Sequence, residues 1–216
     1  MVNKRVNPGC VVKVGDGRGF IIEVRNGTAL GHFSERRLVL TAAHCLPKLP
    51  PACTWSYTEE RTYPNLLGRL RGKRNVWAEC LFVDPVADIA VLGCPDNQML
   101  VKESEAYDAL IGDAPVLLIG KARSGKGWLL DLDGAHWIPT NLHLNSGWYG
   151  TSLDTGRTKA GMSGSPILND RGRAVGVVVV GEVGGSAEGE DGPHPILTSN
   201  LPGWLLAAGN IEKRTR

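Results

Sequence analysis

The sequence lacks any long apolar run. No stretch approaches the roughly 18 consecutive apolar residues that a membrane helix needs. Met1 to Cys10 contains basic residues with no apolar segment after them, which does not match a secretory signal. A strong excess of one charge is also missing, because 24 basic and 22 acidic residues leave a net charge of only +2. These absences predict a cytoplasmic protein without a membrane or nucleic-acid partner.

Cysteine is scarce, and its spacing is irregular. The chain has five cysteines, an odd number that does not suit a disulfide framework. They are Cys10, Cys45, Cys53, Cys80 and Cys94. A Cys45–Cys53 bridge is one interpretation, but free thiols in a reducing cytosol are the preferred one. The cysteines form no CxxC pair and the histidines show no metal spacing, so no zinc and no cofactor is expected.

Turn formers and short apolar runs dominate the chain instead. Its 28 glycines and 13 prolines separate many short runs of Val, Ile and Leu. This pattern predicts an all-β barrel or sandwich, and 216 residues suffice for a sizeable core. The polar segment 102–110 has helical character. We predict a first lobe over 1–95, a connector over 96–113 and a second lobe over 114–216 that ends in a short helix at about 201–208.

The hexapeptide Gly161–Pro166 places one serine, Ser163, between two glycines. A serine hydroxyl is a poor nucleophile at neutral pH, so it needs a neighbouring base and donors aimed at the developing oxyanion. Glycines allow the tight backbone turn that points consecutive N–H groups at one place. Taken alone, however, the hexapeptide is more typical of a simple turn between two strands.

Two upstream stretches contain the partners that Ser163 would need. His44 lies in Thr41-Ala42-Ala43-His44-Cys45, at the end of a predicted strand. Asp88 immediately precedes the apolar run Ile89–Leu92. A base, an acid and a nucleophile therefore occur in the order His, Asp, Ser, which is one of the known orders for such triads.

The motifs TAAHC, DIAVL and GMSGSP together resemble the trypsin-like (chymotrypsin-fold) serine proteases. Each motif is weak alone, but three in this order with suitable gaps make the resemblance specific. The resemblance covers roughly Gly9 to Leu206, which is nearly the whole chain. GMSGSP is more similar to bacterial glutamyl endopeptidases and some viral proteases than to trypsin, and DIAVL is similar to heat-shock-associated bacterial proteases. The resemblance implies two six-stranded antiparallel β-barrels of the chymotrypsin type, with the short C-terminal helix packed on a barrel.

The same resemblance implies the site residues of a serine endopeptidase acting on proteins or peptides. The triad would be His44, Asp88 and Ser163, and the backbone N–H groups of Gly161 and Ser163 would form the oxyanion hole. Asp84 is the rival for the acid. Asp88 is preferred because the family acid directly precedes the Ile-Ala pair, whereas Asp84 before a proline more naturally starts a turn.

Met162 departs from the trypsin-type zymogens, which carry an aspartate at that position. Their aspartate pairs with a new N-terminus after cleavage, and a thioether cannot form that ion pair. The start of the chain also lacks the Ile-Val-Gly-Gly segment that would be inserted. We therefore expect an enzyme that needs no N-terminal activation.

The specificity pocket of the family maps onto residues on both sides of the nucleophile. They are Arg157, Thr158, Val179, Val180 and Gly181. The base-of-pocket aspartate of trypsin-type enzymes falls at Arg157, and a cation there would repel substrate Lys or Arg. Thr158 resembles the hydroxyl that glutamyl endopeptidases use, although their pocket histidine is replaced by Val178. We expect an acidic or small uncharged residue before the scissile bond.

Other interpretations stay open at this point. The main alternative is a catalytically silent trypsin-fold binding module, and a chaperone-like function ranks last. The basic cluster Arg69–Arg74 could meet nucleic acid, but a solvated hairpin tip fits it better. Gly120–Lys126 has the spacing of a phosphate-binding loop, yet Gly127 stands where Mg²⁺ binding needs Ser or Thr, so a β-hairpin loop is preferred.

Overall fold

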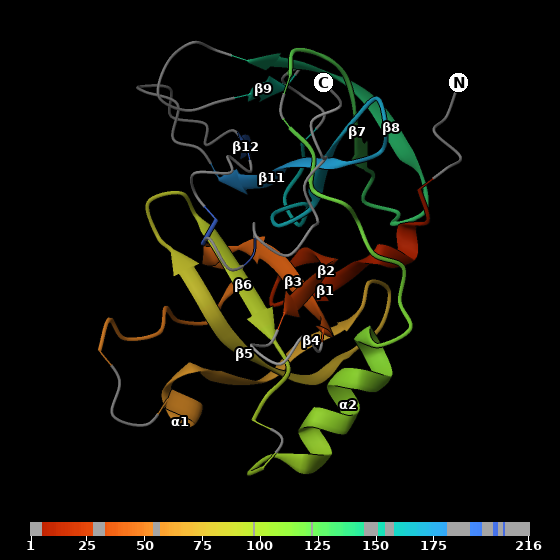
Figure 1. Ribbon diagram of the computed structural model, residues 1–216. Helices are drawn as coiled ribbons and strands as arrows, with labels where there is room; N and C mark the ends of the chain where they lie inside the picture. Colours follow the sequence, from red (N-terminus) through yellow and green to blue (C-terminus); the bar gives the residue numbers. More distant parts are fainter. Residues whose placement is uncertain are drawn as a thin grey trace.

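The protein is mostly β and consists of two lobes, one above the other in Figure 1. The computed structural model describes residues 6–27, 33–53, 57–96, 98–121, 123–144, 151–153, 158–180, 191–195, 201–202 and 205. The first lobe, red to yellow, is the lower one in Figure 1, and the second, green to blue, lies above it. Within the described residues, no helix is both long and apolar enough to cross a membrane.

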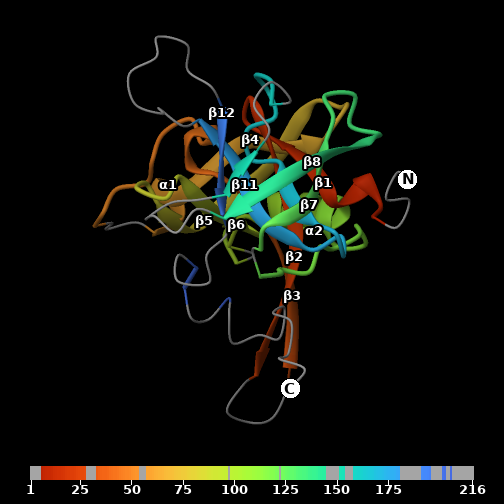
Figure 2. The same cartoon turned by 90° about the horizontal axis from the view of Figure 1, so that it is seen from above.

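The first lobe is a closed six-stranded antiparallel barrel with the strand order β1-β2-β3-β6-β5-β4. Its strands are β1 (Val11–Val14), β2 (Gly17–Gly27), β3 (Phe33–Ala42), β4 (Thr62–Arg69), β5 (Arg74–Asp84) and β6 (Ile89–Gly93). β6 is buried along its whole length, which fits its continuous apolar run. The predicted first barrel is therefore confirmed. The paired ends of β2 and β3 extend away from the body of the lobe (Figure 2).

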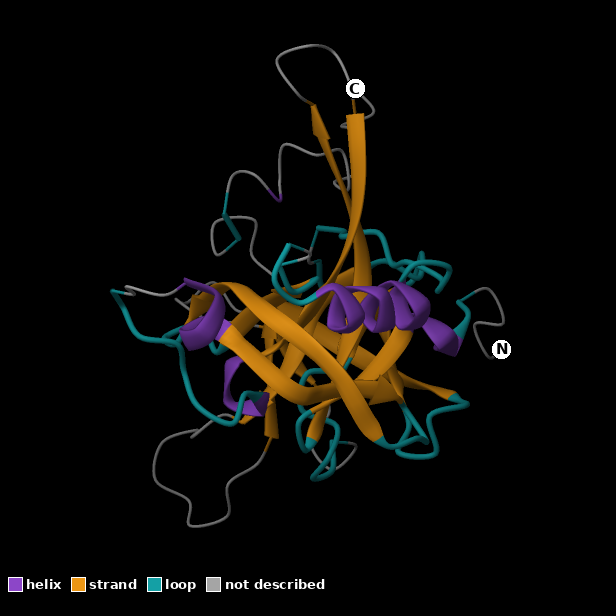
Figure 3. Ribbon diagram, turned by 90° about the horizontal axis from the view of Figure 1, so that it is seen from below, coloured by secondary structure: helices purple, strands orange, loops and turns teal. Residues whose placement is uncertain are grey.

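Helix α2 (Val101–Ile111) follows the first barrel and lies across it (Figure 3). It confirms the helix predicted between the lobes. Tyr107 and Ile111 are buried, and the Tyr107 hydroxyl donates to the carbonyl of Arg37 at 3.0 Å. Two apolar anchors one helical turn apart, with a hydrogen bond to β3, fix the helix on the barrel. The shorter helix α1 (Tyr57–Arg61) precedes β4.

The second lobe is a six-stranded sheet with the order β12-β11-β10-β7-β8-β9. Its strands are β7 (Gly125–Leu130), β8 (Trp137–Leu144), β9 (Thr151–Leu153), β10 (Pro166–Asn169), β11 (Ala174–Val180) and β12 (Asp191–Pro195). The described pairings do not join the two outer strands, so closure of this sheet into a second barrel stays a prediction. The predicted C-terminal helix lies largely outside the described residues.

Three segments differ from what their sequence predicts. The proline-containing stretch 47–64 and the glycine- and acid-rich stretch 184–195 predict loops, and the apolar run 116–119 predicts a strand. β4 occupies part of the stretch expected to be a loop; Pro64, which cannot donate to a ladder, lies where the β4–β5 pairing is irregular. Asp191–Pro195 was expected to be a loop but pairs with β11 as an outer strand, where prolines are tolerated. Val116 to Ile119 makes only an isolated parallel bridge to Ala174 instead of a strand.

Candidate active site

Strand pairing in the first barrel brings His44 beside Asp88. β3 pairs with β6 so that Ala42 lies opposite Ile89, and His44 and Asp88 lie just beyond that pair. The Nδ1 atom of His44 lies 2.6 Å from Oδ2 of Asp88, and the backbone N–H of His44 donates to Oδ1 at 2.9 Å. The Asp88 carbonyl also accepts from the Ala43 N–H at 3.0 Å. The carboxylate therefore fixes both the ring and the backbone of His44.

Asp88 has an unusual backbone conformation, with φ of +51°. Aspartate is one of the few residues that tolerate this left-handed region. Asp84, the rival acid, is the last residue of β5, and its Oδ1 accepts from the N–H groups of Val86 and Ala87 at 3.0 and 2.9 Å. The structure thus brings Asp88, and not Asp84, to the imidazole.

Ser163 lies in a tight loop before β10. Gly161 and Gly164 flank its turn with φ of +88° and +80°, values that favour glycine. The Gly164 N–H donates to the Val178 carbonyl at 2.7 Å, and the Val178 N–H donates to the Ser165 carbonyl at 2.9 Å, so the loop is held against β11. Ser163 is only 9% exposed.

Two backbone N–H groups of this loop take no part in the hydrogen bonds that hold it among the described residues. Met162 closes it, because its N–H donates to the Lys159 carbonyl at 3.0 Å and its carbonyl accepts from Ser165 at 2.9 Å. The buried Met162 sulfur also lies 3.3 Å from the Lys159 nitrogen. Neither the N–H of Gly161 nor that of Ser163 donates to another described residue. Two such donors are what an oxyanion hole requires.

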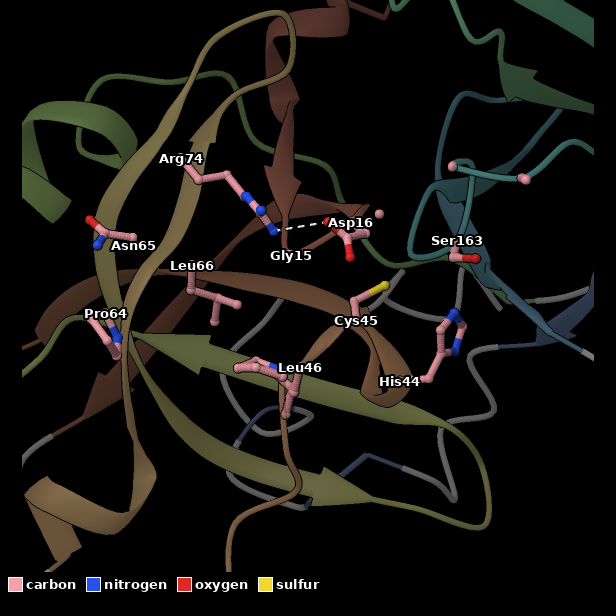
Figure 4. A pocket seen from close by; sticks show the side chains of 14 residues that line it. Gly15, Asp16, His44, Cys45, Leu46, Pro64, Asn65, Leu66, Arg74 and Ser163 are labelled. Atoms are coloured by element: carbon pink, nitrogen blue, oxygen red, sulfur yellow. Dashed lines mark hydrogen bonds and ion pairs between the residues drawn. The ribbon is translucent and has the colours of Figure 1, made fainter.

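His44 and Ser163 line one cleft of about 530 Å³ between the lobes. Figure 4 shows the imidazole of His44 next to Ser163, with the two side chains coming from different lobes. Leu46, Pro64 and Leu66 form an apolar part of the lining, and the Arg74–Asp16 pair, 3.1 Å apart, lies at its edge.

The sequence-predicted site residues divide into two groups. The structure brings together His44, Asp88, Ser163 and Gly161, the four residues expected to carry the chemistry. In the specificity pocket, Thr158 is half-buried and Val179 is buried, while Val180 lies at the end of β11. Arg157 and Gly181 lie outside the described residues.

No group of three or more potential ligands that could hold a metal ion occurs among the residues the structure places. All five cysteines have free thiols, and burial raises the pKa of Cys10 to about 12 and that of Cys45 to about 11. The loop Gly120–Lys126 leads into β7 and not into a helix, so it has no phosphate-binding architecture.

Arg18 is the site residue that sequence reasoning missed. The turn-forming residues before it predict a turn over 15–18, but Arg18 lies in β2 and is only 4% exposed. A Cβ on Gly17 would lie 2.5 Å from the Ser163 carbonyl oxygen, and one on Gly164 would lie 1.8 Å from the Arg18 carbonyl oxygen. The glycines around Arg18 and Ser163 thus mark close packing of two backbones, a signal that the sequence carries only as a glycine pattern.

Comparison with known protein families identifies the family of this chain. A family model described as "Trypsin-like peptidase domain" matches residues 17–177, which is most of the chain. The chain therefore belongs to the trypsin-like peptidase domain family. A comparison with curated proteins finds no match.

Solved structures give matches at low sequence identity. The apo form of the MamO protease domain from Magnetospirillum magneticum is 14% identical, with a TM-score of 0.50 over 90% of this chain and 97% of that chain. The inactive form of the Rv3671c protease is 16% identical, with a TM-score of 0.48 over 94% and 90%. The serine protease domain of the Sesbania mosaic virus polyprotein is 16% identical, with a TM-score of 0.49 over 87% and 88%. The MamO match supports the shared fold alone.

Proposed function

We propose that this chain is a serine endopeptidase that hydrolyses peptide bonds through an acyl-enzyme on Ser163. One observation carries the proposal. The Asp88 carboxylate holds His44 by the ring and by the backbone, and the cleft that His44 lines also contains Ser163. A paired acid and imidazole beside a serine between two glycines form the arrangement that activates a hydroxyl for acyl transfer.

The reaction begins when the Ser163 Oγ attacks the carbonyl carbon of a bound peptide. Because Nδ1 of His44 is engaged by Asp88, the other ring nitrogen, Nε2, takes the serine proton. His44 then gives that proton to the leaving amine as the carbon–nitrogen bond breaks. Water, deprotonated by His44, hydrolyses the acyl-enzyme and returns the proton to Ser163. Asp88 stabilises the imidazolium in both halves.

The oxyanion of each tetrahedral intermediate would be held by the N–H groups of Gly161 and Ser163. Neither donor is used by another described residue, which supports this role. The buried Met162 stands where an ion-pairing aspartate would be needed for N-terminal activation. The loop is instead tied by backbone hydrogen bonds and by Arg18, so the enzyme needs no activation by a new N-terminus.

The acyl-side pocket would use Arg157, Thr158, Val179, Val180 and Gly181. The position of Arg157 in the sequence disfavours substrates with Lys or Arg before the scissile bond, because like charges in a pocket repel. We propose an acidic or small uncharged residue at that place. The second sheet would close into the second barrel of the chymotrypsin type and so complete the wall of this pocket.

A covalent probe tests the proposal against the alternative of a silent binding module. A fluorophosphonate should label the wild-type protein at Ser163, and labelling should be absent from Ser163→Ala and strongly slowed in His44→Ala. Circular dichroism on each variant would establish that it is folded. A folded wild-type protein that does not react would favour the binding module, because phosphonylation needs only an activated serine and an accessible cleft.

A further inference from the structure

Arg18 is a buried cation at the junction of the two lobes. Its side chain reaches from β2 into the second lobe, where Nη1 donates to the carbonyls of Leu130 and Asp131 at 3.1 and 3.0 Å. Nη2 donates to the carbonyl of Leu132 at 3.0 Å. Burial lowers the pKa of the guanidinium, while the nearby carboxylates of Asp131 and Asp133 act in the opposite direction. A buried charge is costly unless it is well hydrogen-bonded, and here three carbonyl oxygens serve that purpose.

The backbone of Arg18 is engaged as closely as its side chain. Its N–H donates to the carbonyl of Ser163 at 2.7 Å, so the proposed nucleophile loop is tied directly to the first barrel. Its carbonyl accepts from the buried Thr41 hydroxyl at 2.6 Å. Thr41 lies on β3, three residues before His44 in the sequence. One residue therefore links the segments that carry the base and the nucleophile.

The turn held by the guanidinium lies against the proposed oxyanion hole. A Cβ on Gly161 would have a single neighbour within 4 Å, the Cδ2 atom of Leu132 at 3.8 Å. The carbonyl of Leu132 is the one that Nη2 of Arg18 holds. Arg18 thus binds the Ser163 carbonyl and also the backbone of Leu132, the residue whose side chain lies nearest to a Cβ built on Gly161.

We propose that Arg18 is a positioning residue that keeps the Gly161–Ser163 loop in its oxyanion-binding shape, in place of an ion pair made by a new N-terminus. The inference deepens the proposed function and rests on it. Lysine could not replace Arg18 fully, because a single ammonium lacks the planar fork that reaches Leu130, Asp131 and Leu132 at once. The loop is therefore preformed because of a contact present in the chain as it folds.

Arg18→Met and Arg18→Lys test the proposal, with Arg37→Met and Arg37→Lys as matched controls. The Arg37 guanidinium also donates to three carbonyls, those of Ile111, Gly112 and Ala114, but these lie at the end of α2 and just after it, away from the cleft. Each variant would be assayed for kcat and KM on one peptide substrate, for inhibition by a peptide boronate that mimics the tetrahedral intermediate, and for thermal midpoint.

Arg18→Met should lower kcat by about 10²- to 10³-fold, because that is the effect of losing an oxyanion donor. KM should change by less than about threefold, since binding of the substrate ground state does not need the formed hole. Boronate affinity should fall with kcat, and Arg18→Lys should be intermediate. The Arg37 variants should lose stability and keep the wild-type kcat.

Several outcomes would overturn the inference. The first is a folded Arg18→Met or Arg18→Lys with wild-type kcat and boronate affinity. The second is an equal loss of kcat in the Arg37 variants, which would mean that general stability, and not loop position, sets the rate. If neither Arg18 variant folds, Arg18 is a stability element and the positioning role is withdrawn. Failure of the proposed function is distinguishable, because the wild type itself would then neither cleave peptide nor react with a fluorophosphonate.

Discussion

Replacing Asp88 with asparagine gives the sharpest prediction about the triad. Asparagine tolerates the positive φ of +51° at this position, so the backbone should stay in place. The amide NH₂ would face Nδ1 of His44 where a carboxylate oxygen now lies at 2.6 Å. Nδ1 must then accept a hydrogen bond, which leaves the proton on Nε2, so His44 cannot take the proton of Ser163.

The expected loss is about 10⁴-fold in kcat, which corresponds to roughly 5.4 kcal/mol at 1.36 kcal/mol for each factor of ten. Asp84→Asn is the matched control. Asp84 directly precedes the turn that contains Asp88 and accepts hydrogen bonds from two backbone N–H groups of that turn, but it does not contact the imidazole. Its variant should lose some stability and retain wild-type kcat. Kinetics on a peptide substrate, with thermal midpoints for both proteins, would decide. An inactive Asp84→Asn beside an active Asp88→Asn would refute the assignment of the acid.

Three further predictions concern stability. The five free thiols imply equal thermal midpoints with and without reductant; a large drop on reduction would contradict this, since losing a native disulfide typically costs about 2–5 kcal/mol. Burial is the main cause that raises the pKa of the Glu79 carboxyl above its ordinary value of 4.5; Asp96 raises it further, and Arg61 opposes the shift. The wild type should therefore lose stability as the pH rises from 4.5 through the raised pKa of the folded state. Glu79→Gln should therefore be more stable than wild type at neutral pH and equal to it below pH 4.5 in pH-dependent unfolding, whereas a constant difference would exclude this cause. Gly164→Ala should lower the thermal midpoint more than Gly161→Ala: both have positive φ, but only the first places a Cβ 1.8 Å from a backbone oxygen, and equal drops would show that φ alone matters.

Much of the first lobe follows from local sequence signals. β6 is an unbroken apolar run, and α2 is a polar segment with a buried face, so both were predictable from pattern. The order of His44, Asp88 and Ser163 in the sequence predicts the candidate site. β12 was not predictable, because a segment with two prolines becomes a strand only when β11 offers its edge.

The burial of Arg18, by contrast, could not be predicted from the sequence. Nothing local distinguishes an arginine in Gly17-Arg18-Gly19 from one in a solvated turn. Its burial depends on carbonyl oxygens that are 112 to 114 residues away in the sequence. Long-range backbone acceptors leave no residue-type signature, because any side chain can stand at 130–132. A contact of this kind is visible only when the two lobes are assembled.

The central claim is that Ser163 attacks peptide carbonyls, and cleavage of a diverse peptide library tests it most directly. Mass spectrometry of the library after incubation would identify every new terminus produced by the wild type and by Ser163→Ala under the same conditions. The account predicts cleavage by the wild type alone, with acidic or small uncharged residues before the cut bond and few Lys or Arg. A library left intact by the folded wild type, or cut equally by Ser163→Ala, would contradict it.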